Sequence, residues 1–156
     1  MIIIRDSNEQ DPFPFVHPVQ QQNLHKDGLT GDYTIKGMEK IVCLERKRGE
    51  ELWGCLGSKR EFFKHQLERM AAYPIRILLV EGSLEDFSHK PRYSQLTWSL
   101  VSYRLMRWTI RHAIPIWFLG PRSAASVRLV EDQLTAIWDL YRRDRKMLAN
   151  WKGMMK

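Results

Sequence analysis

Cysteine is scarce in this sequence, because only Cys43 and Cys55 occur among its 156 residues. Two thiols are too few for a disulfide scaffold, and their separation matches no CxxC zinc or redox spacing. Long apolar runs are also missing. The longest, Ile75–Val80, is far short of the roughly 20 residues that cross a bilayer, and the opening MIIIRDSNEQ is too short for the core of a signal peptide. These absences predict a cytoplasmic protein with no membrane association.

Common cofactor motifs are absent as well. The five histidines show no metal-ligand spacing, and there is no glycine-rich phosphate loop. Basic residues, in contrast, are in excess: 25 Lys and Arg against 18 Asp and Glu give a net charge of +7, which favours a polyanionic partner. The length and the 44% of hydrophobic residues predict a single domain over residues 1–156, with a basic tail from about residue 142.

Hydrophobic periodicity predicts alternating strands and helices. A β-branched strand at Ile2–Ile4 leads into a proline-containing loop, and two β-rich runs within Leu29–Lys47 flank the polar turn Lys36–Glu39 as a hairpin. The remaining predicted elements are a helix over Ser58–Tyr73, a strand over Ile75–Val80, a helix over Gln95–His112, a strand over Ile114–Leu119 and a helix from about Ser123. The strand–helix–strand unit requires a parallel crossover, so the predicted fold class is α/β, a mixed sheet flanked by helices.

The predicted hairpin would bring two carboxylates together. If its turn is centred between Met38 and Glu39, Asp32 lies directly opposite Glu45, with Cβ atoms about 4.5–5.5 Å apart. Period-two alternation places Lys47 on the same face as Glu45 and Arg46 on the opposite face. Two like charges held this close repel each other unless a cation lies between them.

A hard divalent metal is the natural cation for this position. Mg²⁺ prefers oxygen ligands and commonly binds one or two carboxylates together with water and phosphate oxygens. An ammonium beside it, such as that of Lys47, could orient or deprotonate a water or neutralise a phosphate oxygen. This combination indicates phosphodiester hydrolysis. A surface hairpin with solvated cross-strand ion pairs is the alternative that spacing alone leaves open.

The order of these residues resembles the nuclease domain of the XPF-type structure-specific endonucleases. Gly31-Asp32-Tyr33, a strand, then Glu45-Arg46-Lys47 and Glu51 are similar to the family signature GD(x)nERKxxxD, with Glu51 in place of Asp. Asp6-Ser7-Asn8-Glu9-Gln10 is similar to the opening DxREQxP strand, with Asn8 in place of Arg. Leu79-Val80-Glu81 and Ile114-Pro115-Ile116 resemble the LLxE and IPV strands. The resemblance spans nearly the whole chain and implies the restriction-endonuclease-like fold of the PD-(D/E)xK group.

The resemblance implies a role for individual residues. It assigns Asp32, Glu45 and Lys47 to catalysis, with Lys47 as the base or the water-orienting group. It also implies Mg²⁺ as the cofactor, for which Mn²⁺ is expected to substitute. The metal ligands would be Asp32 and Glu45, with Asp6 or Glu9 as further acids. Supporting positions are Asn8, Glu51 and Gln66, and DNA contacts are expected from Arg46, Arg48, Lys59 and Arg60. Arg46 has an equally good interpretation as a structural ion-pair partner, because alternation points it away from Lys47.

The implied function is a metal-dependent endonuclease acting on branched or flapped DNA during recombination, repair or phage genome processing. The layout is closest to compact stand-alone forms of phages and bacteria, so we expect a bacterial or phage-infected host cytoplasm. No tandem helix-hairpin-helix module is present, so phosphate electrostatics would dominate DNA binding. The broad apolar face of Gln95–His112 predicts a homodimer. A non-catalytic DNA-binding or scaffolding subunit with the same fold is the alternative function.

Overall fold

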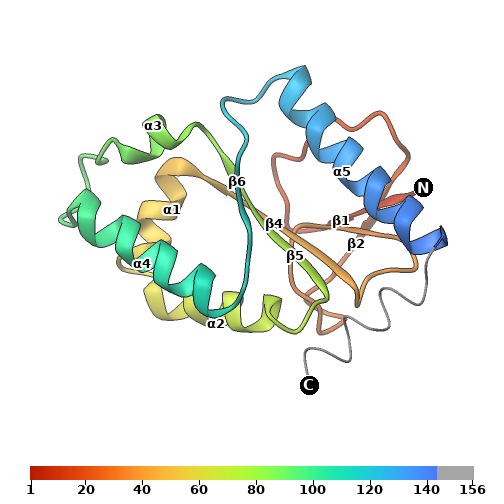
Figure 1. The fold of residues 1–156 in the computed structure, drawn as a ribbon, viewed down its shortest axis with the longest axis horizontal. Coiled ribbons are helices and arrows are strands. Elements are labelled where there is room, and N and C mark those ends of the chain that lie inside the picture. The colour runs from red at the N-terminus through yellow and green to blue at the C-terminus, as the bar shows by residue number, and fades with distance from the viewer. Residues whose placement is uncertain (144–156) are drawn as a thin grey trace.

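Six strands form one mixed sheet with helices on both faces (Figure 1). The structure is a computed structural model that describes residues 1–143. The strands are β1 (Ile3–Asp6), β2 (Val19–Gln22), β3 (Tyr33–Ile35), β4 (Val42–Arg48), β5 (Ile75–Glu81) and β6 (Ile116–Phe118). The helices are α1 (Gly49–Leu56), α2 (Arg60–Met70), α3 (Leu84–Ser88), α4 (Trp98–Arg111) and α5 (Ala124–Arg143). The spatial order of the strands is β2-β1-β3-β4-β5-β6. The predicted α/β class is therefore confirmed.

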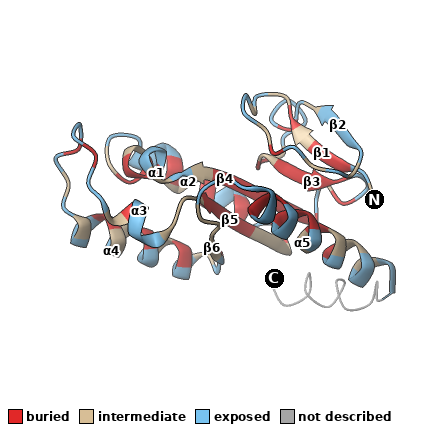
Figure 2. Ribbon diagram, turned by 90° about the horizontal axis from the view of Figure 1, so that it is seen from above, coloured by how far each residue is buried: buried red, intermediate tan, exposed pale blue. Residues whose placement is uncertain are grey.

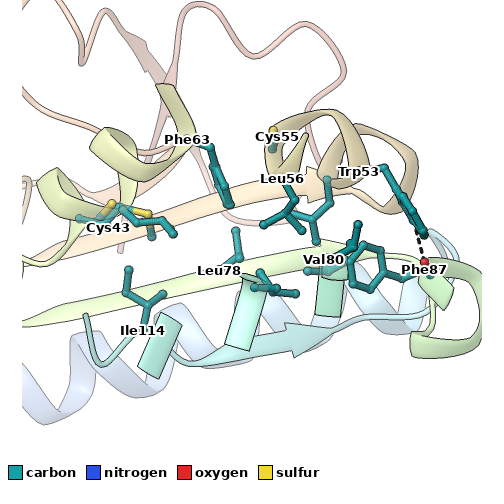
Figure 3. Packing of buried hydrophobic residues seen from close by; sticks show 14 of the residues in the cluster. Cys43, Trp53, Cys55, Leu56, Phe63, Leu78, Val80, Phe87 and Ile114 are labelled. Atoms are coloured by element: carbon teal, nitrogen blue, oxygen red, sulfur yellow. Dashed lines mark hydrogen bonds between the residues drawn. The ribbon is translucent and has the colours of Figure 1, made fainter. Parts of the chain in front are cut away.

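Strand β4 lies in the middle of the sheet and separates two hydrophobic layers. Its side chains alternate, so that Val42 and Leu44 pack with α5 on one face. Cys43 packs on the other face against α1, α2 and α4 (Figure 3). The sequence predicted that Ile41–Leu44 would be covered on both sides, and all four residues are buried.

The strands on either side of β4 run in different directions. β3 is antiparallel to β4, which confirms the predicted hairpin, whereas β5 and β6 are parallel to β4 and to each other. The carboxyl ends of β4, β5 and β6 therefore meet at one edge of the sheet. Figure 2 shows that exposed residues cover the outward sides of α4 and α5 while the strands between them are mostly buried.

Three elements were not predicted from the sequence. Helix α1 carries glycines at positions 49 and 54, which lower helix propensity, but it forms because Leu52, Trp53 and Leu56 are all buried. The edge strand β2 reads VQQQ and is largely exposed, so it shows no apolar run. The short α3 lies in a polar segment expected to be a loop and begins with a Ser83 capping box.

Apart from its first two residues, the predicted basic tail lies outside the described residues. Within the part of the chain that the structure describes, no helix is long and apolar enough to cross a membrane.

Candidate active site

The hairpin register brings Asp32 and Glu45 together as the sequence predicted. Tyr33 pairs with Leu44, so the next residues outward, Asp32 and Glu45, face each other across β3 and β4. The Asp32 amide donates to the Leu44 carbonyl at 2.8 Å, and the Arg46 amide donates to Asp32 Oδ2 at 2.7 Å. The carboxylate of Asp32 is thus held in place by the backbone of the opposite strand.

Gly31 shapes the backbone in front of Asp32. Its φ of +102° lies in the region that favours glycine. A Cβ at this position would lie 2.8 Å from Cys43 Sγ and 3.1 Å from the Leu44 carbonyl oxygen. The glycine of the Gly31-Asp32 pair therefore allows the chain to pass directly over β4.

Gly31→Ala is expected to destabilise the fold by more than Gly37→Ala. Both glycines have positive φ, which costs a non-glycine residue about 1–2 kcal/mol, but nothing lies within 4 Å of a Cβ built at Gly37. Gly31→Ala adds the overlap with Cys43 and Leu44, typically a further 1–3 kcal/mol. Urea denaturation of both variants measures the difference. Equal losses would show that the close approach at Gly31 has no energetic role.

The charge environment of Asp32 is unfavourable without a cation. Burial and the neighbouring Glu45 carboxylate raise the pKa of Asp32 well above its usual range, and they outweigh the opposing effects of Lys47 and the Arg46 amide. Glu45 is itself only 2% exposed. Two carboxylates in this position supply the hard oxygen ligands that fit Mg²⁺.

Lys47 lies on the same face as the two acids. Its Nζ donates to Glu45 Oε1 at 2.6 Å and lies 3.4 Å from Glu51 Oε1. Burial lowers the pKa of Lys47, but the Glu45, Glu51 and Asp32 carboxylates outweigh burial and raise it above its ordinary value. Lys47 is therefore an ammonium at neutral pH. This charge favours the water-orienting role over the role of general base.

Asp32→Asn is expected to stabilise the metal-free protein at neutral pH. The folded pKa of Asp32 lies above its unfolded value, so Asp32 reduces stability as pH rises from about 4 through the folded pKa. Asparagine keeps the acceptor for the Arg46 amide and removes the repulsion of Glu45. We expect a melting temperature a few degrees above wild type at about pH 8 and no gain at about pH 4. Thermal denaturation at both pH values, with the exposed Asp132→Asn as control, tests this. A wild-type protein that is more stable than Asp32→Asn at about pH 8 would contradict it.

Asp6 and Glu9, the further acids expected near a metal, are engaged elsewhere. Asp6 Oδ1 accepts from the Asn8 amide at 2.7 Å and its Oδ2 from the Leu24 amide at 2.8 Å, so both oxygens bind backbone. Glu9 accepts two hydrogen bonds from Arg46. The Asp6 amide also donates to the Asp32 carbonyl at 2.8 Å, so Asp6 lies beside Asp32, but the carboxylate oxygens of Asp6 and Glu9 already accept hydrogen bonds from other groups. Within residues 1–143 no cluster of three or more His, Cys, Asp or Glu could hold a metal ion.

Arg46 is the centre of an ion-pair network on the opposite face of β4. It contacts Glu9 at 2.9 Å and also pairs with Glu81, and its guanidinium lies 5.4 Å from the centre of the Phe13 ring. Arg122 joins the network through Glu81, at 3.0 Å. Arg46 is only 8% exposed and fully paired, so the structure supports its interpretation as a structural ion-pair partner.

Sequence reasoning missed Arg122 and Asp11, which complete this network. Arg122 bonds Asp11 Oδ1 at 2.8 Å, and Arg48 pairs with the other Asp11 oxygen. They line a cleft of about 800 Å³ at the carboxyl ends of the strands. The sequence did hold a signal for this network, because Glu81 ends β5 and Arg122 follows β6, and the carboxyl ends of these parallel strands meet at that edge.

The other predicted site residues lie in several environments. Asn8 is exposed in the turn after β1, and Gln66 is buried on the inner side of α2. Lys59 and Arg60 are exposed where α2 begins, and Arg60 lies 3.4 Å from Glu61. These two and Arg48 are open to a ligand, whereas the side chains of Asn8 and Gln66 form no hydrogen bond with Asp32 or Glu45.

Comparison with known proteins identifies the family of the chain. Residues 4–129 match the ERCC4 domain, which is most of the chain. The chain belongs to the ERCC4 domain family. No curated protein sequence matches it significantly. The XPF-type nuclease resemblance stated from the sequence is thereby confirmed for the fold and the family.

Solved structures show the same fold around this ERCC4 domain. It is similar to XPF from Aeropyrum pernix in complex with DNA, with a TM-score of 0.64 and 19% identity over 88% of this chain and 64% of that one. A second structure, of XPF from Aeropyrum pernix, gives a TM-score of 0.61 at 19% identity, over 93% of this chain and 73% of that one. The chain therefore spans a little under two thirds of the length of the first of these structures.

Proposed function

We propose that this ERCC4 domain is a metal-dependent DNA endonuclease whose active site is formed by Asp32, Glu45 and Lys47. The observation that carries this proposal is the Tyr33–Leu44 register, which aligns both acids on the face that also holds Lys47. Family membership and the similarity to an XPF–DNA complex support DNA as the substrate. The basic excess of the chain fits the same partner.

Asp32 and Glu45 would hold a divalent cation, Mg²⁺ or Mn²⁺, between their carboxylates. When bound, such a cation neutralises the developing charge on the phosphate and activates water. The chain itself supplies the rest of the site. The Arg46 amide fixes Asp32, and the Lys47 ammonium, which donates to Glu45, would also donate to a substrate or water oxygen brought beside Glu45.

Branched or flapped DNA is the substrate that we propose, in recombination, repair or phage genome processing. The test is incubation of the protein with labelled flap, fork, Holliday-junction and single-stranded DNA, with Mg²⁺ and with EDTA. Metal-dependent cleavage nearest a junction supports the proposal. Binding without cleavage of any substrate would instead support the non-catalytic subunit.

A homodimer would place two such sites on one branched substrate. Helix α4 exposes Tyr103, Met106 and Ile110, at 60%, 42% and 76%, beside the edge strand β6. Apolar residues this exposed next to an unpaired strand edge are typical of an interface.

Ile110→Asp is expected to convert the dimer to a monomer. Burying an unpaired charge in an apolar interface costs several kcal/mol. Light scattering at micromolar concentration would report the mass of two chains for wild type and of one chain for Ile110→Asp, with Leu84→Asp, an exposed apolar residue on α3, as the dimeric control. A wild-type mass of one chain would contradict the homodimer.

A further inference from the structure

A basic pocket lies between the loop of residues 27–30 and the end of α2, on the face of the sheet that carries Asp32. It has a volume of about 440 Å³, and Thr30, Lys40, Arg69 and Tyr73 supply its hydrogen-bond donors. Lys40 and Arg69 are exposed, and neither has an acidic partner among the described residues. The acid that lines the pocket, Asp27, already accepts a hydrogen bond from Gln22 at 2.9 Å.

The buried wall of the pocket holds a donor without an acceptor. Thr30 is 4% exposed, and its hydroxyl has no hydrogen-bond partner in the structure. Its amide donates to the Tyr73 hydroxyl oxygen at 3.0 Å, an arrangement that leaves the phenolic proton of Tyr73 without an acceptor in the structure. A buried hydroxyl without a partner is costly, so a site of this composition favours an anion that accepts from it.

The pocket is linked directly to the candidate active site. Cys43 and Glu45 project from the same face of β4, about 7 Å apart along the strand, and Cys43 Sγ donates to the Thr30 carbonyl at 3.3 Å. Thr30 also lies two residues before Asp32, a span of at most about 7 Å. Successive nucleotides of one strand rise 3.4 Å each, so the pocket and the two carboxylates are separated by only a few nucleotides.

Basic residues nearer the strand ends are less suited to bind phosphate. Arg46 and Arg122 are held by Glu9, Glu81 and Asp11, so their charge is already neutralised. Lys40 and Arg69 form no ion pair among the described residues, and the pocket lining sets the single acid Asp27 against these two cations. This contrast distinguishes the pocket from the ion-pair network on the other face.

We propose that this pocket binds a phosphate group of the nucleic-acid strand that passes through the active site, a few nucleotides from the scissile bond. This inference rests on the proposed function, because it takes the strand at Asp32 and Glu45 to be the ligand. The pocket sets the path of that strand along α2 and supplements Lys59 and Arg60 at the beginning of the same helix.

The first test compares two double variants that remove the same charge. Lys40→Ala/Arg69→Ala removes the pocket cations, and Lys90→Ala/Arg111→Ala removes an exposed lysine and an arginine from the last turn of another helix. Binding of labelled single-stranded and flap DNA is measured in EDTA over a range of salt. We expect a loss of about tenfold for the pocket variant and a salt slope smaller by about 0.7–0.9, as for the loss of one phosphate contact, against less than threefold for the control. Equal losses of DNA affinity in the two double variants would overturn the proposal that the pocket binds phosphate.

A second variant separates binding from folding. Thr30→Val removes the unpartnered hydroxyl and keeps the shape of the side chain, so the melting temperature should stay the same or rise. We expect DNA affinity to fall severalfold nonetheless. Unchanged affinity would overturn the role of Thr30, and so would a loss of affinity that only follows a lower melting temperature.

Neutral methylphosphonates introduced one at a time locate the bound phosphate. A methylphosphonate at one position, a few nucleotides from the cleavage site, should weaken DNA binding by wild type. The same methylphosphonate should not affect binding by Lys40→Ala/Arg69→Ala, because the modified phosphate and the double variant each remove the same contact. The absence of any such position would contradict the proposal. A different outcome would also overturn the proposal. If inorganic phosphate stabilises wild type but not Lys40→Ala/Arg69→Ala, and the two proteins bind DNA equally well, the pocket is a site for a free anion.

Failure of the pocket and failure of the proposed function give different results. Cleavage by wild type in Mg²⁺ tests the nuclease, and the binding comparison in EDTA tests the pocket. If wild type cleaves DNA and the two double variants bind DNA equally well, only the proposal for the pocket is refuted. If wild type binds DNA through the pocket but cuts no substrate, only the proposed nuclease function is refuted.

Discussion

Lys47→Ala is expected to reduce cleavage by at least about a hundredfold, the usual cost of losing one charged donor at a reacting phosphate or carbonyl. The same change should lower stability, because Glu45 is 2% exposed and would lose the ammonium 2.6 Å from its Oε1. Single-turnover cleavage and urea denaturation measure the two effects. Lys90→Ala, which removes an exposed lysine that has no assigned role in the site, is the control and should retain cleavage and stability.

A paired variant separates the two consequences of losing Lys47. Glu45→Gln/Lys47→Met removes both charges, so no buried charge is left unpaired and stability should return towards wild type. Cleavage should remain absent, because a metal-binding acid and the ammonium are both gone. Cleavage by Lys47→Ala at the wild-type rate would show that Lys47 has only a structural role.

Arg46→Met is expected to destabilise the fold by about 3–5 kcal/mol, the typical cost of breaking a buried ion pair. Glu9 would lose its guanidinium partner, and Glu81 would keep only Arg122. The side chains of Glu9 and Arg46 are each only 7% exposed. Urea denaturation measures the loss of free energy of unfolding.

Arg48→Met is the matched control, two residues along the same strand. Its side chain is 56% exposed and pairs with the half-exposed Asp11, so stability should change by no more than about 1 kcal/mol. Affinity for DNA should show the reverse order, with Arg48→Met the weaker binder. Equal destabilisation by the two changes would contradict a structural role for Arg46.

The sequence predicted the hairpin register correctly because local chemistry determines it. The glycine-bearing turn and the apolar run Ile41–Leu44 leave one register that buries the strand on both faces, and that register pairs Asp32 with Glu45. Alternation then placed Lys47 and Arg46 on opposite faces. The family and the fold followed from the same residues.

Other features depend on contacts between distant segments and could not be predicted. Glu9 and Asp6 have the right chemistry for a metal, but Arg46 binds Glu9, and the Asn8 and Leu24 amides bind Asp6. Helix α1 depends on burial that outweighs its glycines. Thr30 has no signal in the sequence, because its significance lies in a hydroxyl that folding leaves without a partner.

The most direct test of the central claim is single-turnover cleavage of flap DNA by wild type and by Asp32→Asn, each in Mg²⁺ and in EDTA. Asp32→Asn keeps the hydrogen bond from the Arg46 amide and removes one of the two carboxylates, so the protein stays folded while metal binding is lost. We predict cleavage by wild type in Mg²⁺ and none in the other three reactions. Cleavage that persists in EDTA, or that Asp32→Asn performs at the wild-type rate, would contradict the proposed active site.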